Sequence, residues 1–152
     1  MATVTINNSP VHGDSTLSAV YGETGQYWAR YHTGTDFIPY GSTPTNPDLY
    51  SVCDGTVYSK TYDGTLGNQI IIEDSNTGNF WRYCHMQSGS PLNVGDNVTT
   101  STKVGVMGAT RECYRDTLTP RICNFPCMEL LGIFKSKYGF KYSKRTWNYC
   151  TF

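Results

Sequence analysis

The sequence predicts a mainly β domain built on a single antiparallel sheet, and three observations support that fold class. Glycine (15 residues) and tyrosine (12 residues) are abundant in a chain of 152 residues. Asp-Gly and Thr-Gly pairs separate short runs of β-branched and aromatic residues, and helical periodicity is nearly absent. Turn-forming pairs between such runs indicate many short strands joined by tight connections.

The clearest single element is a hairpin over residues 67–86. Residues 68–73 (NQIIIE) provide its outgoing strand, and residues 74–79 (DSNTGN) provide a turn rich in Asp, Asn and Gly. Residues 80–86 (FWRYCHM) return with alternating character. Two strand-like runs on either side of a turn of this composition are typical of a hairpin.

Three further strands and one loop follow from the same signals. Strands are expected at Leu49–Lys60, at Lys103–Met107 and at Met128–Phe134, where an apolar run should lie inside the sheet. Ile38–Asp48 contains three prolines. Because proline lacks the amide hydrogen that a sheet requires, this stretch predicts an irregular loop.

The length and charge of the chain narrow the possible partners. A length of 152 residues suits one ordinary domain, 1–152, which buries roughly two thirds of the surface that its unfolded form exposes. Twelve basic and twelve acidic side chains cancel, so no general electrostatic attraction to nucleic acid or an anionic membrane is expected. No window approaches the ~20 apolar residues of a membrane span, and the first residues lack the pattern of a secretion signal.

The cysteines permit disulfides but do not determine their pairing. The six cysteines are Cys53, Cys84, Cys113, Cys123, Cys127 and Cys150. An even number allows disulfides if the protein works outside a cell, and Cys113 and Cys123 flank a polar loop that they could close. Cys53 and Cys84 lie in predicted strands, where a small buried hydrophobic residue is an equal alternative.

Histidine is scarce, so a metal site has few possible donors. The three histidines are His12, His32 and His85. The segment His32-Thr-Gly-Thr-Asp36 places an imidazole and a carboxylate four positions apart, and Gly34 allows a sharp bend between them. Both side chains can therefore converge on one cation. The alternative is a surface turn with an exposed histidine.

Several segments around this pair occur in a familiar order. They are Tyr21-Gly22, His32–Phe37, Val52–Val57, Gly67–Glu73 with Tyr83–Met86, and Val94–Val98 with Val104–Thr110. Together they resemble the glycine-preceded HxGxD segment, the Asp-Gly-x-Val strand, the YxHL hairpin and the GD.V…G..G.T stretch of the lysostaphin-like zinc endopeptidases, also called M23 or LytM peptidases. The resemblance implies a lysostaphin-like antiparallel sheet, a duplicated hybrid motif, with an open groove, a core at about 21–134 and a basic, aromatic segment at 135–152.

The resemblance also implies roles for three residues. His32 and Asp36 match two zinc ligands of the family, and His85 matches the histidine beside the metal that supports the tetrahedral intermediate or shuttles protons. Zinc held by three protein groups keeps a fourth place for water. An imidazole nearby can take or return a proton during attack on an amide.

The last family motif, HxH followed by a hydrophobic residue and Glu, is altered. Its best match carries Phe125 and Cys127 where the two histidines belong and keeps Glu129. A thiolate is a good zinc ligand, so Cys127 could complete the site, although its added negative charge predicts weaker catalysis. A shifted alignment would offer Asn124 or Cys123 instead. The remaining interpretation is that Cys123 and Cys127 are structural.

The resemblance leaves two functions open. The first is a zinc metalloendopeptidase that hydrolyses peptide bonds of bacterial peptidoglycan, as part of a phage tail or an endolysin, and acts outside the cell or on a virion. The second is an inactive module that binds cell wall or serves as a structural component of a tail tip. The segment 135–152 either contacts anionic wall polymers and sugars or forms a solvated edge.

Overall fold

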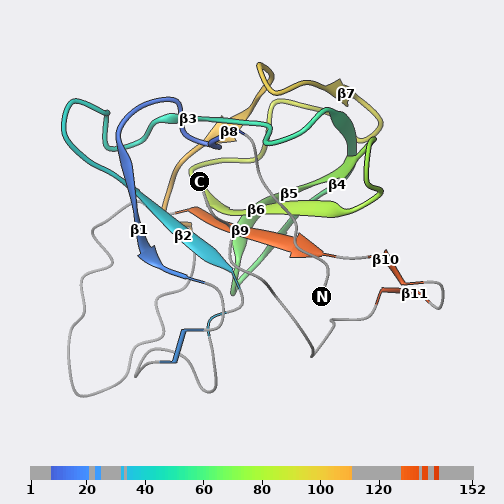
Figure 1. The fold of residues 1–152 in the computed structure, drawn as a ribbon, viewed down its shortest axis with the longest axis horizontal. Coiled ribbons are helices and arrows are strands. Elements are labelled where there is room, and N and C mark those ends of the chain that lie inside the picture. The colour runs from blue at the N-terminus through green and yellow to red at the C-terminus, as the bar shows by residue number, and fades with distance from the viewer. Residues whose placement is uncertain are drawn as a thin grey trace.

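The fold is built from eleven strands in the part of the chain that the structure describes (Figure 1). The computed structural model describes residues 8–20, 23–24, 32 and 34–110, and the backbone of 128–133, 135–136 and 139–140. The strands are β1 (Ser15–Ala19), β2 (Thr35–Pro39), β3 (Asp48–Tyr50), β4 (Gly55–Asp63), β5 (Gly67–Asp74), β6 (Phe80–Met86), β7 (Asn97–Val98), β8 (Lys103–Val106), β9 (Met128–Ile133), β10 (Lys135–Ser136) and β11 (Gly139–Phe140).

Seven strands form the main sheet, in the order β1-β2-β9-β6-β5-β4-β7, and every pair in it is antiparallel. Two small ribbons, β3–β8 and β10–β11, complete the architecture. No helix occurs in the described ranges, and therefore none there that could cross a membrane. The predicted mainly β, antiparallel fold class is confirmed.

The predicted hairpin and the predicted interior strand are both present. β5 and β6 pair along residues 68–73 and 80–86, and the turn Asp74–Asn79 joins them. Asp74 shapes that turn by accepting hydrogen bonds from the amides of Asn76 (2.8 Å) and Thr77 (3.3 Å). β9 covers the apolar run that begins at Met128 and lies between β2 and β6 in the sheet.

One predicted strand, Leu49–Lys60, is wrong as a single element. The chain forms β3 up to Tyr50, bends over residues 51–54, and begins β4 at Gly55. The Ser51 hydroxyl donates to the Cys53 carbonyl (2.6 Å) and so offers the backbone a local partner in place of a strand neighbour. β3 consequently pairs with β8, whereas β4 pairs with β5 and β7. The other two predictions hold to within two residues at each end: β8 ends at Val106, and the irregular loop covers 40–47.

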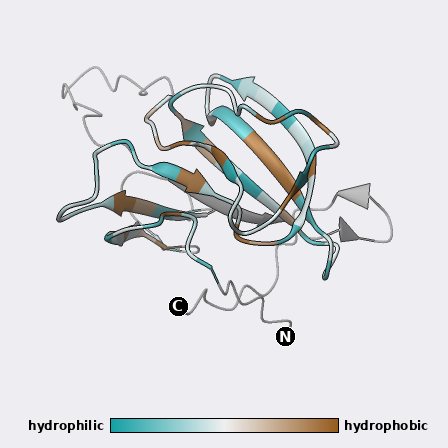
Figure 2. Ribbon diagram, turned by 90° about the horizontal axis from the view of Figure 1, so that it is seen from above, coloured by the Kyte–Doolittle hydropathy of each residue, from teal (hydrophilic) through white to brown (hydrophobic). Residues whose placement is uncertain are grey.

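The core consists of side chains from the main sheet together with side chains from the β3–β8 ribbon. Figure 2 shows hydrophobic stretches within the strands. Alternate residues of β5, including Ile70 and Ile72, are fully buried, as expected for a strand with one face on the core. The ribbon contributes Leu49 and Val104, which are also fully buried. Burying each aliphatic side chain contributes roughly 1.5–3 kcal/mol, so this layer supplies much of the stability of the fold.

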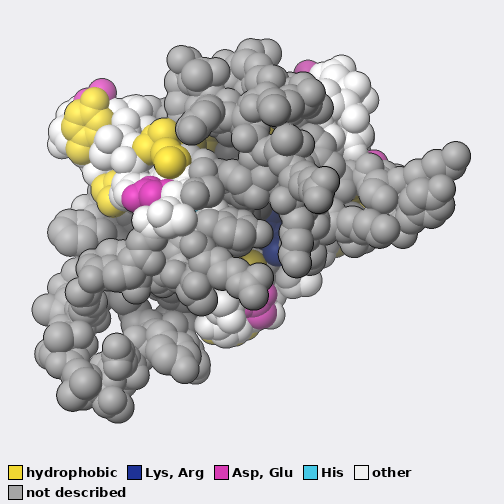
Figure 3. Space-filling model, turned by 60° about the horizontal axis from the view of Figure 1, so that its bottom comes forward, with side chains coloured by type: hydrophobic (Ala, Val, Ile, Leu, Met, Phe, Trp, Pro, Cys, Tyr) yellow, Lys and Arg dark blue, Asp and Glu magenta, His cyan; other side chains and the backbone are white. Residues whose placement is uncertain are grey.

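Large hydrophobic side chains that reach the surface are few in the described ranges: Val20, Tyr40, Tyr58, Tyr62 and Val94. On the face shown in Figure 3, hydrophobic side chains lie beside carboxylates. Singly exposed apolar residues of this kind are ordinary on protein surfaces.

Tyr83 ties the main sheet to the segment that leaves the ribbon. Its ring is fully buried, its hydroxyl donates to the Tyr50 carbonyl (3.1 Å), and the same oxygen accepts from the Val52 amide (2.8 Å). Burial, the largest cause, raises the pKa of Tyr83 well above its ordinary value, so the hydroxyl stays neutral. The contact holds the bend between β3 and β4 against β6.

Replacing Tyr83 by phenylalanine should destabilise the fold by about 1–3 kcal/mol, because it leaves a buried amide and a carbonyl without their partner. The free energy of unfolding in urea measures the change. Tyr62→Phe, at a side chain that is 64% exposed, is the matched control and should change stability by less than about 0.5 kcal/mol. Equal stabilities of the two variants would show that the Tyr83 hydroxyl does not hold this bend.

Candidate metal centre

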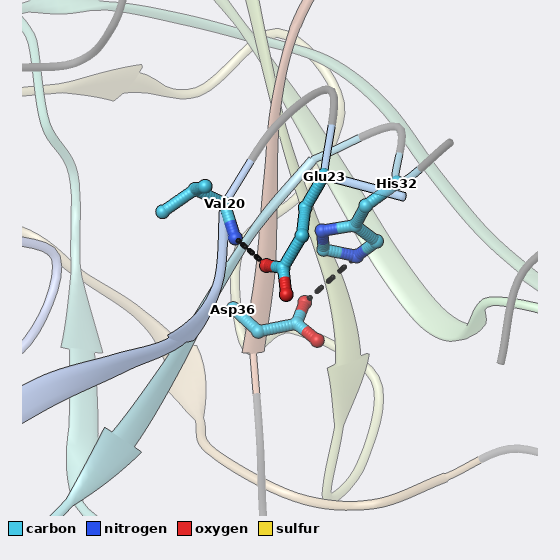
Figure 4. A network of polar contacts seen from close by, with 4 residues as sticks. All are labelled: Val20, Glu23, His32 and Asp36. Carbon is cyan, nitrogen blue, oxygen red and sulfur yellow. Dashed lines mark hydrogen bonds and ion pairs between the residues drawn. The ribbon is translucent and has the colours of Figure 1, made fainter. Parts of the chain in front are cut away.

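The predicted pair His32 and Asp36 is brought together at the start of β2. Gly34 stands at a bend directly before the strand, and Asp36 is its second residue. His32 Nε2 lies 3.4 Å from Asp36 Oδ1, and their side chains are 12% and 22% exposed (Figure 4). The bend therefore does what the HxGxD spacing predicts: it turns both side chains to one point while leaving that point accessible.

The separation of these two atoms suits a shared zinc ion better than a direct ion pair. Charge-assisted N–H···O contacts are about 2.7–2.9 Å long. Two ligands bound tetrahedrally at about 2.0–2.1 Å from one zinc lie roughly 3.3 Å apart. The observed 3.4 Å matches this second geometry. Two of the donors that a zinc site requires therefore fit the group that the fold family implies.

Glu23 supports this pair and was missed by sequence reasoning. Its backbone carbonyl accepts from the His32 amide at 2.8 Å, its amide donates to the Val20 carbonyl at 3.1 Å, and its side chain accepts from the Val20 amide at 3.0 Å. Figure 4 shows the Glu23 carboxylate facing the same space as Asp36. The two carboxylates give that space negative potential, which favours a cation. Only its position directly after Gly22 could have singled out Glu23.

His85 lies at a bulge where β6 meets β5. Asn68 pairs with Met86 and Ile70 with Tyr83, so Cys84 and His85 together stand opposite the single residue Gln69. His85 has a φ of 57°, the one positive φ among the described residues other than glycine, and its side chain is 5% exposed. A bulge with a left-handed residue redirects a side chain out of the regular strand alternation. His85 is thereby aimed differently from its neighbours.

The sheet places His85 and Asp36 at the same end of two strands that flank β9. Leu130 of β9 pairs with Thr35 on one side and with Tyr83 on the other. Asp36 follows Thr35 and His85 follows Tyr83 in the same direction, since both strands are antiparallel to β9. Two strand spacings separate them, roughly 10 Å, which leaves room for a substrate group between them.

Among the described residues, no group of three or more His, Cys, Asp or Glu side chains is arranged to hold a metal ion. The predicted ligand Cys127 lies outside the described residues, as do Tyr21, Gly22, Asn124 and Phe125. The further cysteines Cys113, Cys123 and Cys150 lie outside them too.

The described cysteines and the remaining histidine are placed elsewhere. Cys53 is a free thiol, and burial, reinforced by the Asp74 carboxylate, raises its pKa to about 12. It is therefore a neutral thiol rather than a thiolate ligand. Cys84 is buried in β6. His12 stacks on Tyr50 with ring centroids 3.8 Å apart, on the β3 ribbon rather than at β2.

The antiparallel β domain and its His32–Asp36 pair at zinc-ligand separation agree with the class of zinc peptidase folds that the sequence resemblance implies. The chain belongs to Peptidase family M23, whose model matches residues 30–123, more than half of its length. The match begins after Tyr21-Gly22, includes His32, Asp36 and His85, and ends before Phe125 and Cys127. The predicted family resemblance is confirmed.

Solved structures share the fold. A zinc containing peptidase from Vibrio cholerae is similar at a TM-score of 0.61 and 24% identity over 82% of this chain. A mutant of the catalytic domain of the prophage-encoded M23 protein EnpA from Enterococcus faecalis has a TM-score of 0.63 and 19% identity over 87% of this chain and 91% of that one. The antimicrobial peptidase lysostaphin from Staphylococcus simulans has a TM-score of 0.59 and 18% identity over 89% of this chain. The chain spans 35% of the Vibrio protein and 49% of lysostaphin.

Proposed function

We propose that this protein is a zinc-dependent endopeptidase that hydrolyses peptide bonds in bacterial peptidoglycan. The observation that carries the proposal is the 3.4 Å separation of His32 Nε2 and Asp36 Oδ1 in a member of Peptidase family M23. A peptidase from Vibrio cholerae described as zinc containing shares the fold. Zinc bound by this pair would supply Lewis acidity toward an amide carbonyl.

Cys127 is the proposed third zinc ligand. Met128, its chain neighbour, begins β9 and pairs with Phe37, the residue after Asp36. Glu129 pairs with Asp36, and Cys127 stands two residues before Glu129 in the sequence. A thiolate there would donate more charge than an imidazole and make the cation a weaker Lewis acid, so we expect a slow enzyme.

His85 is the proposed proton carrier. An imidazole can take and return a proton near neutral pH, which the attack of water on an amide requires. The bulge in β6 holds its backbone while its side chain is largely shielded from solvent. Phenylalanine at position 125 has no proton to exchange, so His85 would perform this task without the second histidine usual in the family.

The proposed substrate is the peptide part of bacterial cell wall, and the proposed setting is a phage tail or lysin that acts outside the cell or on a virion. Two structural neighbours motivate this choice: one is described as prophage-encoded and another as an antimicrobial peptidase. The balanced charge of this chain gives no reason to add a nucleic-acid partner.

The altered last motif favours one alternative, a module that binds wall peptide, or builds a tail tip, without cleaving it. The family match ends at Cys123, before the two positions where histidines are replaced. If neither Cys127 nor the Cys123 or Asn124 of the shifted alignment binds metal, the fold would serve recognition rather than cleavage.

Purified wild-type protein should contain about one zinc ion per chain, and His32→Ala and Cys127→Ser should each lose it, because two ligands hold zinc too weakly to survive purification. Elemental analysis measures the metal. Cys53→Ser is the matched control: it also removes one thiol, but one that stays protonated, so zinc should be retained. Metal-free wild-type protein, or full zinc in Cys127→Ser, would contradict the proposed ligand set.

His85→Ala should lower the rate at which the protein clears suspensions of bacterial cell wall by roughly 10²–10⁴-fold, the usual contribution of a general acid or base. Turbidity loss and the release of new amino termini measure the reaction. His12→Ala, which removes an imidazole stacked on Tyr50, should leave the rate unchanged. An unchanged rate in His85→Ala would remove His85 from the mechanism.

A further inference from the structure

The backbone at His85 needs outside support, because residues other than glycine rarely adopt its conformation. Its φ of 57° lies in the left-handed region, which is unfavourable for a residue with a Cβ. Such a conformation persists only where the surroundings determine it. The contacts of His85 and its neighbour Met86 therefore decide where the imidazole lies.

Thr110 contacts the backbone on both sides of the bulge. Its amide donates to the His85 carbonyl at 3.4 Å, and its hydroxyl donates to the Met86 carbonyl. The same hydroxyl oxygen accepts from the Asn68 amide at 3.1 Å. One side chain thus bridges β5 and β6 at the point where their register shifts.

Two glycines permit this close approach. A Cβ at Gly67 would lie 1.5 Å from the Thr110 carbonyl oxygen, and a Cβ at Gly108 would lie 2.3 Å from the Gln87 amide nitrogen. A side chain at Gly67 would push Thr110 away from β5, and one at Gly108 would push the segment 108–110 away from Gln87, which follows β6. Gly108 and Thr110 close the G..G.T pattern, which therefore has a physical meaning in this chain: it lets a backbone segment approach the residues around His85.

The turn between β4 and β5 holds the other side of His85. The Leu66 carbonyl accepts from the His85 amide at 2.8 Å. Asp63 shapes this turn by accepting from the amides of Thr65 (2.8 Å) and Leu66 (2.6 Å), and Gln69, which is 4% exposed, donates to the same carboxylate. The hydrogen bond from the Leu66 amide is the largest cause that lowers the pKa of Asp63, so the turn keeps its ionised acceptor at neutral pH.

We propose that Thr110 is a positioning residue whose hydroxyl locks the β6 bulge and thereby fixes the left-handed conformation that aims the His85 imidazole. The inference rests on the proposed function of His85 as proton carrier and adds a residue outside the metal-binding and proton-transfer groups. Without the hydroxyl, the Met86 carbonyl and the Asn68 amide lose their common partner. The bulge can then relax toward regular strand geometry, which turns the imidazole away.

The test is the rate at which diethyl pyrocarbonate modifies His85, mapped by mass spectrometry of peptides. His85 is 5% exposed, so its modification reports opening of the bulge. Thr110→Val, which keeps the shape and removes the hydroxyl, should accelerate modification about five- to tenfold, the factor that one lost hydrogen bond allows. Thr110→Ser keeps the hydroxyl, so both the modification of His85 and the cleavage of cell wall should proceed at the wild-type rates.

Thr77→Val is the matched control, since it removes a hydroxyl that donates to Asp74 at the opposite end of the β5–β6 hairpin. It should leave the modification rate of His85 unchanged. Asn68→Ala removes a side-chain donor to the Met86 carbonyl (3.3 Å) and should accelerate modification in the same direction, about two- to fivefold, even where Thr110→Val folds poorly.

A wild-type rate in both Thr110→Val and Asn68→Ala, or equal acceleration by Thr77→Val, would overturn the positioning role. The modification requires neither metal nor turnover. A wild-type protein without peptidase activity would therefore defeat the proposed function and leave this measurement able to decide the role of Thr110.

Discussion

The candidate site depends on β9 pairing with two partners at once. Its residues 128–130 pair with β2 at Thr35–Phe37, and its residues 130–133 pair with β6 at Phe80–Tyr83. β2 and β6 are not neighbours in the sheet, because β9 lies between them. Only this strand, which lies far along the chain from β2, brings the His32–Asp36 pair and the His85 bulge to one end of the sheet.

The chain departs from regular β structure at the residues of the candidate site. Gly34 bends the backbone so that His32 and Asp36 converge, and His85 occupies a left-handed conformation in a bulge. The remainder of β5 and β6 pairs regularly and packs alternate residues into the core. The left-handed conformation of His85, held by its surroundings, is consistent with a functional role for this residue.

Much of this could be predicted from the sequence, where the signal is local. The hairpin of β5 and β6, the interior strand β9 and the convergence of His32 and Asp36 all follow from residue spacing and turn composition. The break between β3 and β4 was missed because Val52 and Cys53 suit a strand, while the bend depends on a hydrogen bond within residues 51–53. Strand propensity alone does not reveal a local hydrogen bond that competes with strand pairing.

The missed parts of the site involve contacts between distant segments or backbone geometry. Glu23 contacts His32 through its backbone carbonyl, which a residue of any type could supply. The residue type at position 23 therefore gives little sequence signal. The left-handed conformation of His85 also leaves no signal in the sequence, because the residues that bond its backbone, Leu66 and Thr110, lie on separate segments. Gly67 and Gly108 belong to segments that resemble family motifs, but the reason for glycine at each position is seen only from the backbone that approaches it.

The central chemical claim is that a sulfur donor replaces the missing histidine and completes a site begun by His32 and Asp36. Substituting cobalt(II) for zinc tests it most directly, because a tetrahedral cobalt site with a thiolate ligand absorbs through sulfur-to-metal charge transfer in the near ultraviolet. The account predicts that band in the wild-type protein and in Cys53→Ser, and its loss in Cys127→Ser. A cobalt spectrum without the band, or one that Cys127→Ser leaves unchanged, would contradict it.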